Sequence, residues 1–247
     1  MAGAVNIAEV MFPGGSPELV EPIYKNPKLS APFNEQLADV ICAYVRHRLP
    51  SLAPGEKVLL RLVNAHQGAL CSLCSAVESQ PGALRIEATV ETTWAPFLAL
   101  VMCCLVQVCI AEIGSGSGGT SGVVMDALAP LADSVDFLYT DISPALVGYG
   151  RRTYGGTYPF ARLQLLDVEK DVQGEGIGSY DIVFATNVLH ATRNMGNTLQ
   201  NCKALLRRGG LMLANELTTK TDFLTLTFGL TEGWWMYDDH KWRMPGV

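Results

Sequence analysis

The second half of the chain places a polar side chain at or just after the end of each of its apolar segments. A carboxylate can accept hydrogen bonds from the hydroxyl and amino groups of a ligand. A neutral imidazole can remove a proton near neutral pH, because the pKa of a free histidine side chain is roughly 6.5. Residues of these types, brought together, can bind a small molecule and move a proton on it. In chain order they are Glu112, Asp141, Asp167, Asn187, His190 and Glu216.

The segments that carry these residues have the pattern of strands, and the stretches between them have the pattern of helices. Apolar residues recur at helical spacing in 120–132, and Ser143 followed by Pro144 is typical of a helix start. Strands that alternate with helices predict an α/β fold with a doubly wound, mostly parallel sheet. The expected strands are 109–113, 135–141, 161–169, 180–188 and 211–217.

A third helix is expected over residues 194–210. Gly209 is expected to end this helix after basic residues in its last turn. Its apolar face would consist of Leu199, Cys202, Leu205 and Leu206. Ligands of a doubly wound sheet bind beyond the carboxyl ends of the strands. The polar residues at the strand ends should therefore lie on one edge of the sheet and form one site.

The loop "EIGSGSGGTSG" follows the first of these strands and carries glycines at 114, 116, 118 and 119. Glycine lets a backbone turn sharply and approach a ligand closely. Gly114, Gly116 and Gly119 formally match G-x-G-x-x-G, so a nicotinamide dinucleotide is one candidate cofactor. Glu112, directly before the loop, and Asp167, after the third strand, favour a nucleoside without a pyrophosphate. We therefore expect the loop to bind S-adenosylmethionine.

The expected contacts of this cofactor follow from the chemistry of its parts. Asp141 would accept hydrogen bonds from the ribose hydroxyls, and Asp167 would bind the exocyclic amino group of the adenine. The full set of expected cofactor-binding residues is Glu112, Gly114, Ser115, Gly116, Asp141, Ile142, Asp167, Val168 and Asn187. No metal site is expected.

His190 is the candidate catalytic base, and Glu216 is its candidate partner. The strands that end near these two residues are neighbours in the predicted sheet, roughly 4.8 Å apart. A carboxylate on one ring nitrogen would orient the imidazole and stabilise the imidazolium that forms after proton transfer. The alternative for His190 is an exposed histidine that caps the following helix. Trp234 and Trp235 could line a pocket for an apolar substrate, although such aromatic pairs also occur as plain core.

Composition places the chain among globular proteins of a reducing compartment. It has 247 residues, of which 49% are hydrophobic and 17% are charged, with a formal net charge of −6. The acidic balance argues against a nucleic-acid partner. The first residues lack the features of a secretory signal, and seven cysteines show no disulfide framework. We therefore expect a cytoplasmic location.

Residues 59–109 differ from the rest of the chain, because they hold five of the seven cysteines and only five charged residues. The stretch 94–111 has a single polar side chain, Gln107, and is near the length of a membrane span. A membrane helix, a buried core segment and an insertion foreign to the fold, such as a translated intron, are the three alternatives. Cys71 and Cys74 have half of the spacing of a zinc site, with no second pair at suitable spacing.

Several motifs together resemble the C-methyltransferase domain of type I polyketide synthases. The resemblance covers residues ~8–58 and ~110–247. A Gly-rich loop occurs in all class I methyltransferases, whereas "NVLHAT" and "TEGWW" are more specific. The motifs are "MFPGGSPELVEPIYKNPKLSAPFNEQLADVICAYV", "EIGSGSGGTS", "YTDIS", "DVEKD", "YDIVFATNVLHAT", "LLRRGGLMLANE" and "LTFGLTEGWW".

The resemblance implies a Rossmann-like class I fold and S-adenosylmethionine-dependent methylation of the α-carbon of a β-ketoacyl chain. The partners it implies are an acyl carrier protein that holds the chain as a thioester, and neighbouring synthase domains. It also implies that His190 and Glu216 form the catalytic dyad and that Tyr24 lies over the active site. Neither a nucleic acid nor a membrane is an expected partner.

The resemblance divides the chain into three parts. Residues 1–58 would be an N-terminal helical lid that includes the amphipathic stretch 32–48, residues 59–109 an insertion, and residues 110–247 the cofactor-binding core. Because only 31 residues follow Glu216, the sixth and seventh strands of the family have no room, and the core is expected to be truncated. A methyltransferase-like domain that has become purely structural, and a small-molecule O- or N-methyltransferase, remain alternative functions.

Overall fold

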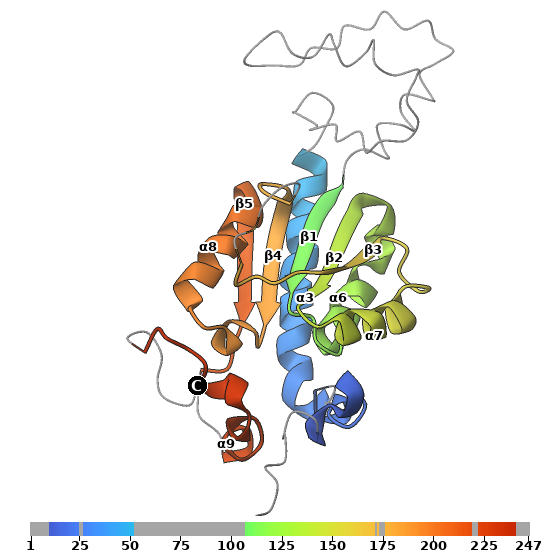
Figure 1. Cartoon of the computed structure of the whole chain (residues 1–247). Coiled ribbons are helices and arrows are strands. Elements are labelled where there is room, and N and C mark those ends of the chain that lie inside the picture. Colours follow the sequence, from blue (N-terminus) through green and yellow to red (C-terminus); the bar gives the residue numbers. More distant parts are fainter. Residues whose placement is uncertain are drawn as a thin grey trace, which may run out of the picture.

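The fold is a five-stranded parallel sheet with helices on both faces. The computed structural model describes residues 10–24, 27–51, 107–170, 172, 176–218 and 222–240. The strands run side by side in the order β3-β2-β1-β4-β5, and every neighbouring pair is parallel (Figure 1). This confirms the predicted doubly wound sheet. The strands are β1 (Val108–Ile113), β2 (Val135–Asp141), β3 (Ala161–Leu165), β4 (Tyr180–Thr186) and β5 (Leu206–Asn215).

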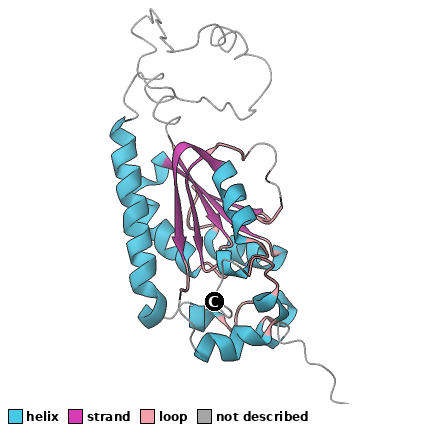
Figure 2. Ribbon diagram, turned by 90° about the vertical axis from the view of Figure 1, so that its left-hand side faces the viewer, coloured by secondary structure: helices cyan, strands magenta, loops and turns pink. Residues whose placement is uncertain are grey.

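The described helices form the two outer layers and the region at the carboxyl edge of the sheet. The longest, α3, lies along one face of the strands, on the left of the sheet in Figure 2. The α-helices are α2 (Glu21–Tyr24), α3 (Pro27–Ser51), α6 (Gly119–Leu128), α7 (Pro144–Tyr154), α8 (Met195–Leu205) and α9 (Asp222–Thr227). Short 3-10 helices are η1 (Pro13–Gly15), η2 (Ala129–Ser134), η3 (Leu189–Ala191), η4 (Phe228–Leu230) and η5 (Glu232–Trp235).

Alternating side chains of the strands feed two apolar clusters, one on each face of the sheet. Ile110 of β1 packs with residues of α3 and α6, whereas Ala111, the next residue, packs with residues of α8. Because both faces are covered, the central strands are buried along nearly their whole length. This rigid centre holds the strand ends, and the side chains they carry, in fixed relative positions.

The helix expected at 194–210 is five residues too long at its end, and the roles expected of Leu199, Leu206 and Gly209 are wrong. α8 ends at Leu205, and the chain enters β5 at once, so Leu206 pairs with Tyr180 in the sheet. Gly209, with φ of 79°, lies inside β5 near a register irregularity rather than at a helix end. Leu199 is 40% exposed, whereas Cys202 and Leu205 are buried as predicted, together with Thr198.

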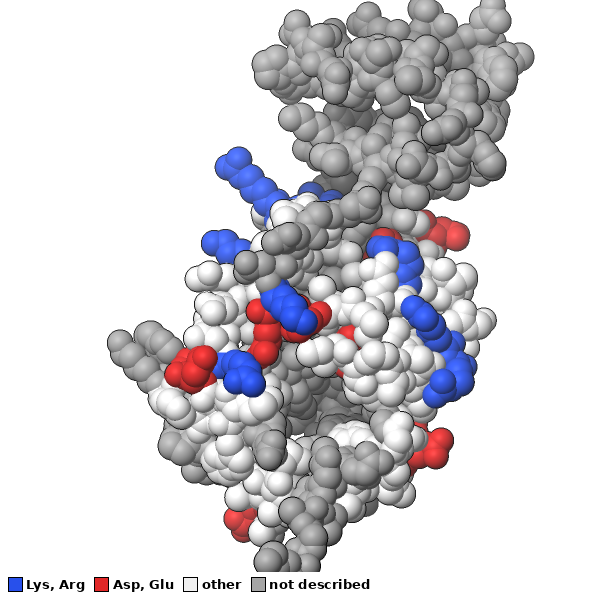
Figure 3. All heavy atoms as spheres, viewed as in Figure 1, with Lys and Arg blue, Asp and Glu red and all other residues white. Residues whose placement is uncertain are grey.

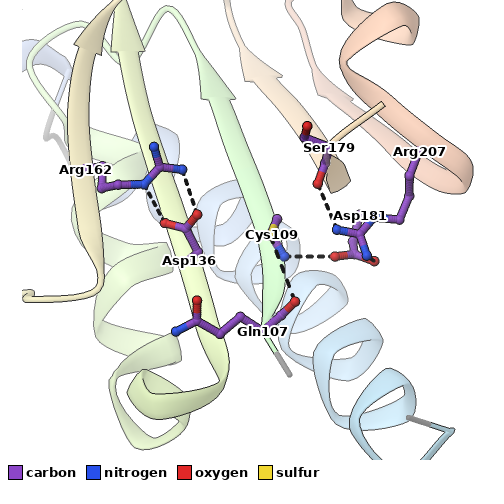
Figure 4. Close-up of polar contacts among 7 residues, drawn as sticks. All are labelled: Gln107, Cys109, Asp136, Arg162, Ser179, Asp181 and Arg207. Atoms are coloured by element: carbon purple, nitrogen blue, oxygen red, sulfur yellow. Dashed lines mark hydrogen bonds and ion pairs between the residues drawn. The ribbon is translucent and has the colours of Figure 1, made fainter. Parts of the chain in front are cut away.

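An ion-pair network at the amino edge of the sheet explains this early strand start (Figure 4). The Asp181 carboxylate accepts the backbone N–H of Cys109 at 2.8 Å and pairs with the Arg207 guanidinium at 3.0 Å. Arg207 also donates to the backbone carbonyl of Ser179 at 2.8 Å. These bonds tie the starts of β1, β4 and β5 together. The tertiary partners of Arg207 therefore outweigh the local preference of a basic residue for a helix end.

Residues 32–48 form a helix within α3 as predicted, but α3 is not a lid. Ile41, Cys42 and Val45 are buried in the same apolar cluster as residues of β1, β2 and β4, so the helix is part of the core. The short α2 lies instead near the carboxyl edge of the sheet (Figure 1). The Tyr149 hydroxyl of α7 donates to the Glu21 carboxylate of α2 at 2.6 Å and holds this short helix in place.

Most of the unusual segment 59–109 lies outside the described residues, as do Cys71, Cys74 and residues 94–106. β1 begins at Val108, so the expected core boundary at residue 110 falls inside a strand. No helix within the described ranges is long and apolar enough to cross a membrane. Cys42, Cys109 and Cys202, the cysteines within those ranges, are not in disulfides.

Lysine and arginine side chains are spread over the face in Figure 3, several beside acidic ones.

Candidate active site

The five strand ends meet at one edge of the sheet, as the sequence predicted. All strands run in the same direction, so their carboxyl ends lie together at the lower edge in Figure 1. The register places Glu112 of β1 between Tyr139 of β2 and Phe184 of β4, and Thr186 of β4 opposite Asn215 of β5. The polar residues that follow these positions therefore come from neighbouring strands.

The glycine loop between β1 and α6 has positive φ angles, which favour glycine. Gly114 has φ of 65°, and a Cβ built on it would lie 2.5 Å from Cγ2 of Val188. Gly116 has φ of 58°, and a Cβ there would meet no atom within 4 Å. Gly114 is therefore needed for close packing, whereas Gly116 borders open space. This is the arrangement expected of a loop whose backbone faces a ligand.

Asp141, at the end of β2, anchors the glycine loop. Its Oδ2 accepts the N–H of Gly116 at 2.9 Å, and its Oδ1 accepts the N–H of Ser143 at 2.8 Å. Burial raises the pKa of this carboxyl, and the N–H groups of Ser143, Gly116 and Ile142 oppose the rise. Each oxygen keeps a second lone pair, so the same carboxylate can still accept a hydrogen bond from a ligand. The ribose contact of Asp141 stays a prediction.

Glu112 is a buried carboxyl beneath the glycine loop. It is 1% exposed, and its Oε2 has no hydrogen-bond partner among the described residues. The hydroxyls of Ser115 and Ser121 are buried beside it without a hydrogen bond of good geometry, and they still act on the carboxyl. Buried polar atoms are nearly always paired, so this carboxyl has room for a further hydrogen-bond donor beside the two hydroxyls. A ligand with a cationic amino group would fit, because it would both donate hydrogen bonds and offset the carboxylate charge.

The protonation of Glu112 leads to a prediction on stability. Burial raises its pKa to about 7; the hydroxyls of Ser121 and Ser115 oppose the rise and Asp141 adds to it. The folded protein then holds a proton that the unfolded chain has released between pH 4.5 and 7, so stability falls as pH rises through this window. Glu112→Gln should raise the free energy of unfolding at pH 8 by as much as about 3 kcal/mol, and little at pH 5.

Chemical denaturation of both proteins at pH 5 and pH 8 measures this effect, with Glu35→Gln on the exposed surface of α3 as the matched control. The same variant should bind S-adenosylmethionine more weakly, since a neutral amide replaces the anionic group. A gain in stability that is equal at both pH values would show that the carboxyl of Glu112 is not buried in its charged form.

The remaining expected cofactor-binding residues differ in what they offer a ligand. Ile142, directly after Asp141, is 64% exposed at the carboxyl edge, where an apolar side chain can cover a flat base. Val168 is buried under the same edge. The Asp167 carboxylate pairs with Lys170 at 2.9 Å and accepts the N–H of Glu169 at 3.1 Å. Asn187 follows β4 with an exposed side chain.

His190 and Glu216 form the hydrogen-bonded pair that the sequence predicted. His190 Nδ1 lies 2.7 Å from Glu216 Oε2, and both side chains are largely buried. The other oxygen of Glu216 accepts the backbone N–H groups of Val188 and Leu189, each at 2.8 Å. One carboxylate thus holds both the imidazole and the backbone turn that carries it.

The charge of this pair follows from its hydrogen bonds. Burial acts to raise the pKa of the Glu216 carboxyl, but the hydrogen bonds from His190 and from the N–H groups of Leu189 and Val188 together hold it below its usual value. The ionised carboxylate favours a proton on Nδ1 of the imidazole. The lone pair is then on Nε2, which makes that atom the proton acceptor.

The C-terminal segment forms a further side of the site, and the sequence indicated only its two tryptophans. Trp234 meets the His190 ring edge-to-face, with centroids 5.6 Å apart, and stacks on Phe228. Trp235 is 49% exposed, and its indole N–H donates to the carbonyl of Gly229. The two tryptophans therefore have different surroundings, and of the two it is Trp234 that contacts His190.

Residues 238 and 239 clamp this segment onto the start of α8, and the sequence did not reveal them. Asp239 Oδ2 accepts the N–H of Met195 at 2.6 Å, and the N–H of Asp238 donates to the carbonyl of Arg193 at 2.8 Å. An aspartate that caps a helix from a distant segment leaves no local pattern in the sequence. The usual cap, Asn194, is present as well, so the start of α8 does not call for a second one.

Tyr24 is the last residue of α2, near the same edge of the sheet, and its side chain lies outside what the structure describes. Among the described residues, no group of three or more His, Cys, Asp or Glu side chains could hold a metal ion. The edge therefore presents an open glycine loop, a buried carboxyl and a histidine–carboxylate pair.

Comparisons with known proteins show what the chain as a whole is similar to. A family model described as "Methyltransferase domain" matches residues 111–212. The chain is 34% identical over 249 residues to the polyketide synthase PksM of Bacillus subtilis (strain 168), an alignment that covers 100% of this chain and 5% of PksM. The structure of the DszA carbon methyltransferase matches with a TM-score of 0.72 and 32% identity, over 99% of this chain and 50% of that one. The citrinin polyketide synthase CMeT domain matches with a TM-score of 0.53 and 32% identity, over 58% and 39% of the two chains.

Proposed function

This chain is a methyltransferase domain homologous to the carbon methyltransferase domains of polyketide synthases, and we propose that it methylates the α-carbon of a β-ketoacyl thioester. An acyl carrier protein would present this thioester, and the neighbouring domains of a synthase would supply it. The observation that carries the proposal is the His190–Glu216 pair beside the glycine loop. Such a pair provides a base, which removal of a proton from carbon requires.

The edge of the sheet offers a fitting place for S-adenosylmethionine, which supplies an electrophilic methyl group when bound. Gly114, Ser115 and Gly116 would form the backbone of its site, with Glu112 facing its cationic end. Asp141 and Ile142 would hold the ribose and cover the adenine, and Asp167 and Val168 would border the base. Asn187, which follows β4, is the proposed contact of S-adenosylmethionine on that side of the site. The buried carboxyl of Glu112, whose Oε2 makes no hydrogen bond of good geometry among the described residues, supports this arrangement.

The chain's own residues would generate the carbon nucleophile. The proton between the ketone and the thioester is acidic because both carbonyl oxygens share the resulting negative charge. His190 would accept that proton on Nε2, while Nδ1–H continues to donate to Glu216. The carboxylate lies 2.7 Å from Nδ1 and would stabilise the imidazolium that forms. Tyr24 on α2 is proposed to lie over the reacting atoms.

The proposal predicts that the purified chain binds S-adenosylmethionine and methylates carbon. Isothermal calorimetry measures the binding. For the reaction, the S-adenosylmethionine carries a deuterated methyl group, and mass spectrometry of an acetoacetyl-loaded carrier protein shows which atom of the acyl chain received it. Label on the α-carbon is the expected result. Label on oxygen or nitrogen would contradict C-methylation, and an absence of cofactor binding would leave the chain as a structural domain of a synthase.

We also propose the division of the chain that the sequence suggested. Residues 1–58 and 110–247 would form the methyltransferase, and residues 59–109, apart from the first two residues of β1, would be an insertion. The spacing between Ser51, at the end of α3, and Val108, at the start of β1, supports this proposal. Sequencing the transcript tests it: a message that lacks this stretch supports an insertion retained in the gene, and a message that contains it contradicts that origin.

A further inference from the structure

The turn that follows β4 contains an unusual backbone conformation. Asn187 has φ of 55°, and it is the one non-glycine residue with a positive φ in the part of the chain that the structure describes. Residues with a Cβ are strained in this region, and asparagine tolerates it better than most. The side chain of Asn187 is exposed, whereas its backbone N–H donates to the carbonyl of Asn215 at 2.8 Å.

This conformation sets the direction of the two residues that follow. Val188 is turned toward the glycine loop, where its γ-carbons occupy the space that a side chain on Gly114 would need. The N–H groups of Val188 and Leu189 both point to Oε1 of Glu216, at 2.8 Å each. An extended or helical φ at Asn187 would swing both N–H groups away from this oxygen. The same carboxylate would then lose its hold on His190.

We propose that Asn187 is a positioning residue that acts through its left-handed backbone conformation and sets the His190–Glu216 pair against the glycine loop. The kinetic part of this inference rests on the proposed function, in which His190 is the base. The geometric part does not, because it concerns the hydrogen bond between His190 and Glu216 alone. The glycine loop and the catalytic turn are in direct contact at Gly114 and Val188, so a displaced turn displaces the base relative to the bound methyl donor.

Two substitutions that delete the same side chain separate this role from a side-chain contact. Asn187→Gly and Asn187→Ala both remove the amide, but only glycine adopts the positive φ without strain. We expect kcat of Asn187→Ala to be about tenfold below that of Asn187→Gly, which corresponds to about 1.4 kcal/mol. The dissociation constant of S-adenosylmethionine should be the same for both variants.

A matched control is available on α8. Asn197 is exposed in the first turn of this helix with ordinary helical geometry. Asn197→Ala and Asn197→Gly should therefore have the same kcat, and Asn197→Ala should be the more stable of the two. This control shows that the expected order at Asn187 reflects its own backbone and not a general effect of glycine.

Nitrogen-15 NMR of the imidazole in the full chain gives a readout that does not need turnover. In the parent protein and in Asn187→Gly, the His190 Nδ1–H signal should report a strong hydrogen bond; in Asn187→Ala it should weaken or broaden. If both variants lose activity equally and bind the cofactor equally poorly, the side chain is what matters and the inference is wrong. If the NMR pattern holds but the parent protein methylates nothing, the proposed function fails while the positioning role stands.

Discussion

Replacing His190 with alanine is expected to lower kcat by about 10³-fold while the dissociation constant of S-adenosylmethionine stays within about threefold. The imidazole is the group that pairs with Glu216 at 2.7 Å, and its Nε2 is the proposed acceptor of the substrate proton. A positioned general base contributes typically 10²- to 10⁴-fold. The glycine loop and Glu112 do not depend on the imidazole, so cofactor binding should survive its loss.

Single-turnover methyl transfer to an acetoacetyl-loaded carrier protein measures the chemical step, and calorimetry measures the cofactor affinity. His47→Ala is the matched control, because His47 is exposed on α3 and distant in sequence from the strand ends. Retention of most of the turnover in His190→Ala would show that another group removes the proton. A loss of cofactor binding as large as the loss of turnover would instead place His190 in the binding site.

The sequence was sufficient to predict the parts of the fold that local patterns determine. The apolar runs of β1, β2 and β4 are bounded by turn residues, and Ser143 followed by Pro144 starts α7 as expected, with Ser143 Oγ accepting the N–H of Leu146. The parallel order of the strands then places Glu112, Asp141, His190 and Glu216 on one edge. The His190–Glu216 pair follows from this topology, since β4 and β5 are neighbours.

The sequence was insufficient where distant residues decide the local structure. Leu206 and Arg207 have the pattern of a helix end. In the structure, Leu206 pairs with Tyr180 and Arg207 forms an ion pair with Asp181, so both residues belong to β5. The amphipathic pattern of α3 predicts a helix with one buried face, yet it does not reveal that this face covers the sheet. The clamp by Asp239 on Met195 spans 44 residues of the chain, so no local pattern points to it.

Removal of the carboxylate of Glu216 is expected to affect both the chemistry and the stability of the catalytic turn. In Glu216→Gln the amide oxygen can still accept the N–H groups of Val188 and Leu189, but the amide nitrogen then faces His190 Nδ1 as a donor. Two donors repel, so the imidazole should change tautomer and carry its proton on Nε2, where the base must be unprotonated. We expect kcat to fall by about 10³- to 10⁴-fold, as in other sites that lose a carboxylate beside histidine.

Glu216→Ala separates the backbone role of the carboxylate from its role beside His190. It leaves the N–H groups of Val188 and Leu189 without an acceptor, at a cost of about 1–3 kcal/mol for each buried donor. Urea denaturation should therefore show a larger loss of stability for Glu216→Ala than for Glu216→Gln, whereas both variants should lose turnover. Equal stability of the two variants would mean that Oε1 does not hold the turn.

The pH dependence of stability provides an independent test of the charge on Glu216. The pKa of this carboxyl is lower in the folded protein than in the unfolded chain, whose usual value is 4.5. Its contribution to stability is therefore present above pH 4.5 and is lost as pH falls through the lowered pKa. The stability difference between the parent protein and Glu216→Gln should be present at pH 6 and should shrink as pH falls below 4.5. A difference that does not change with pH would show that the carboxylate is not held in its ionised form, and the proposed stabilisation of the imidazolium would lose its source.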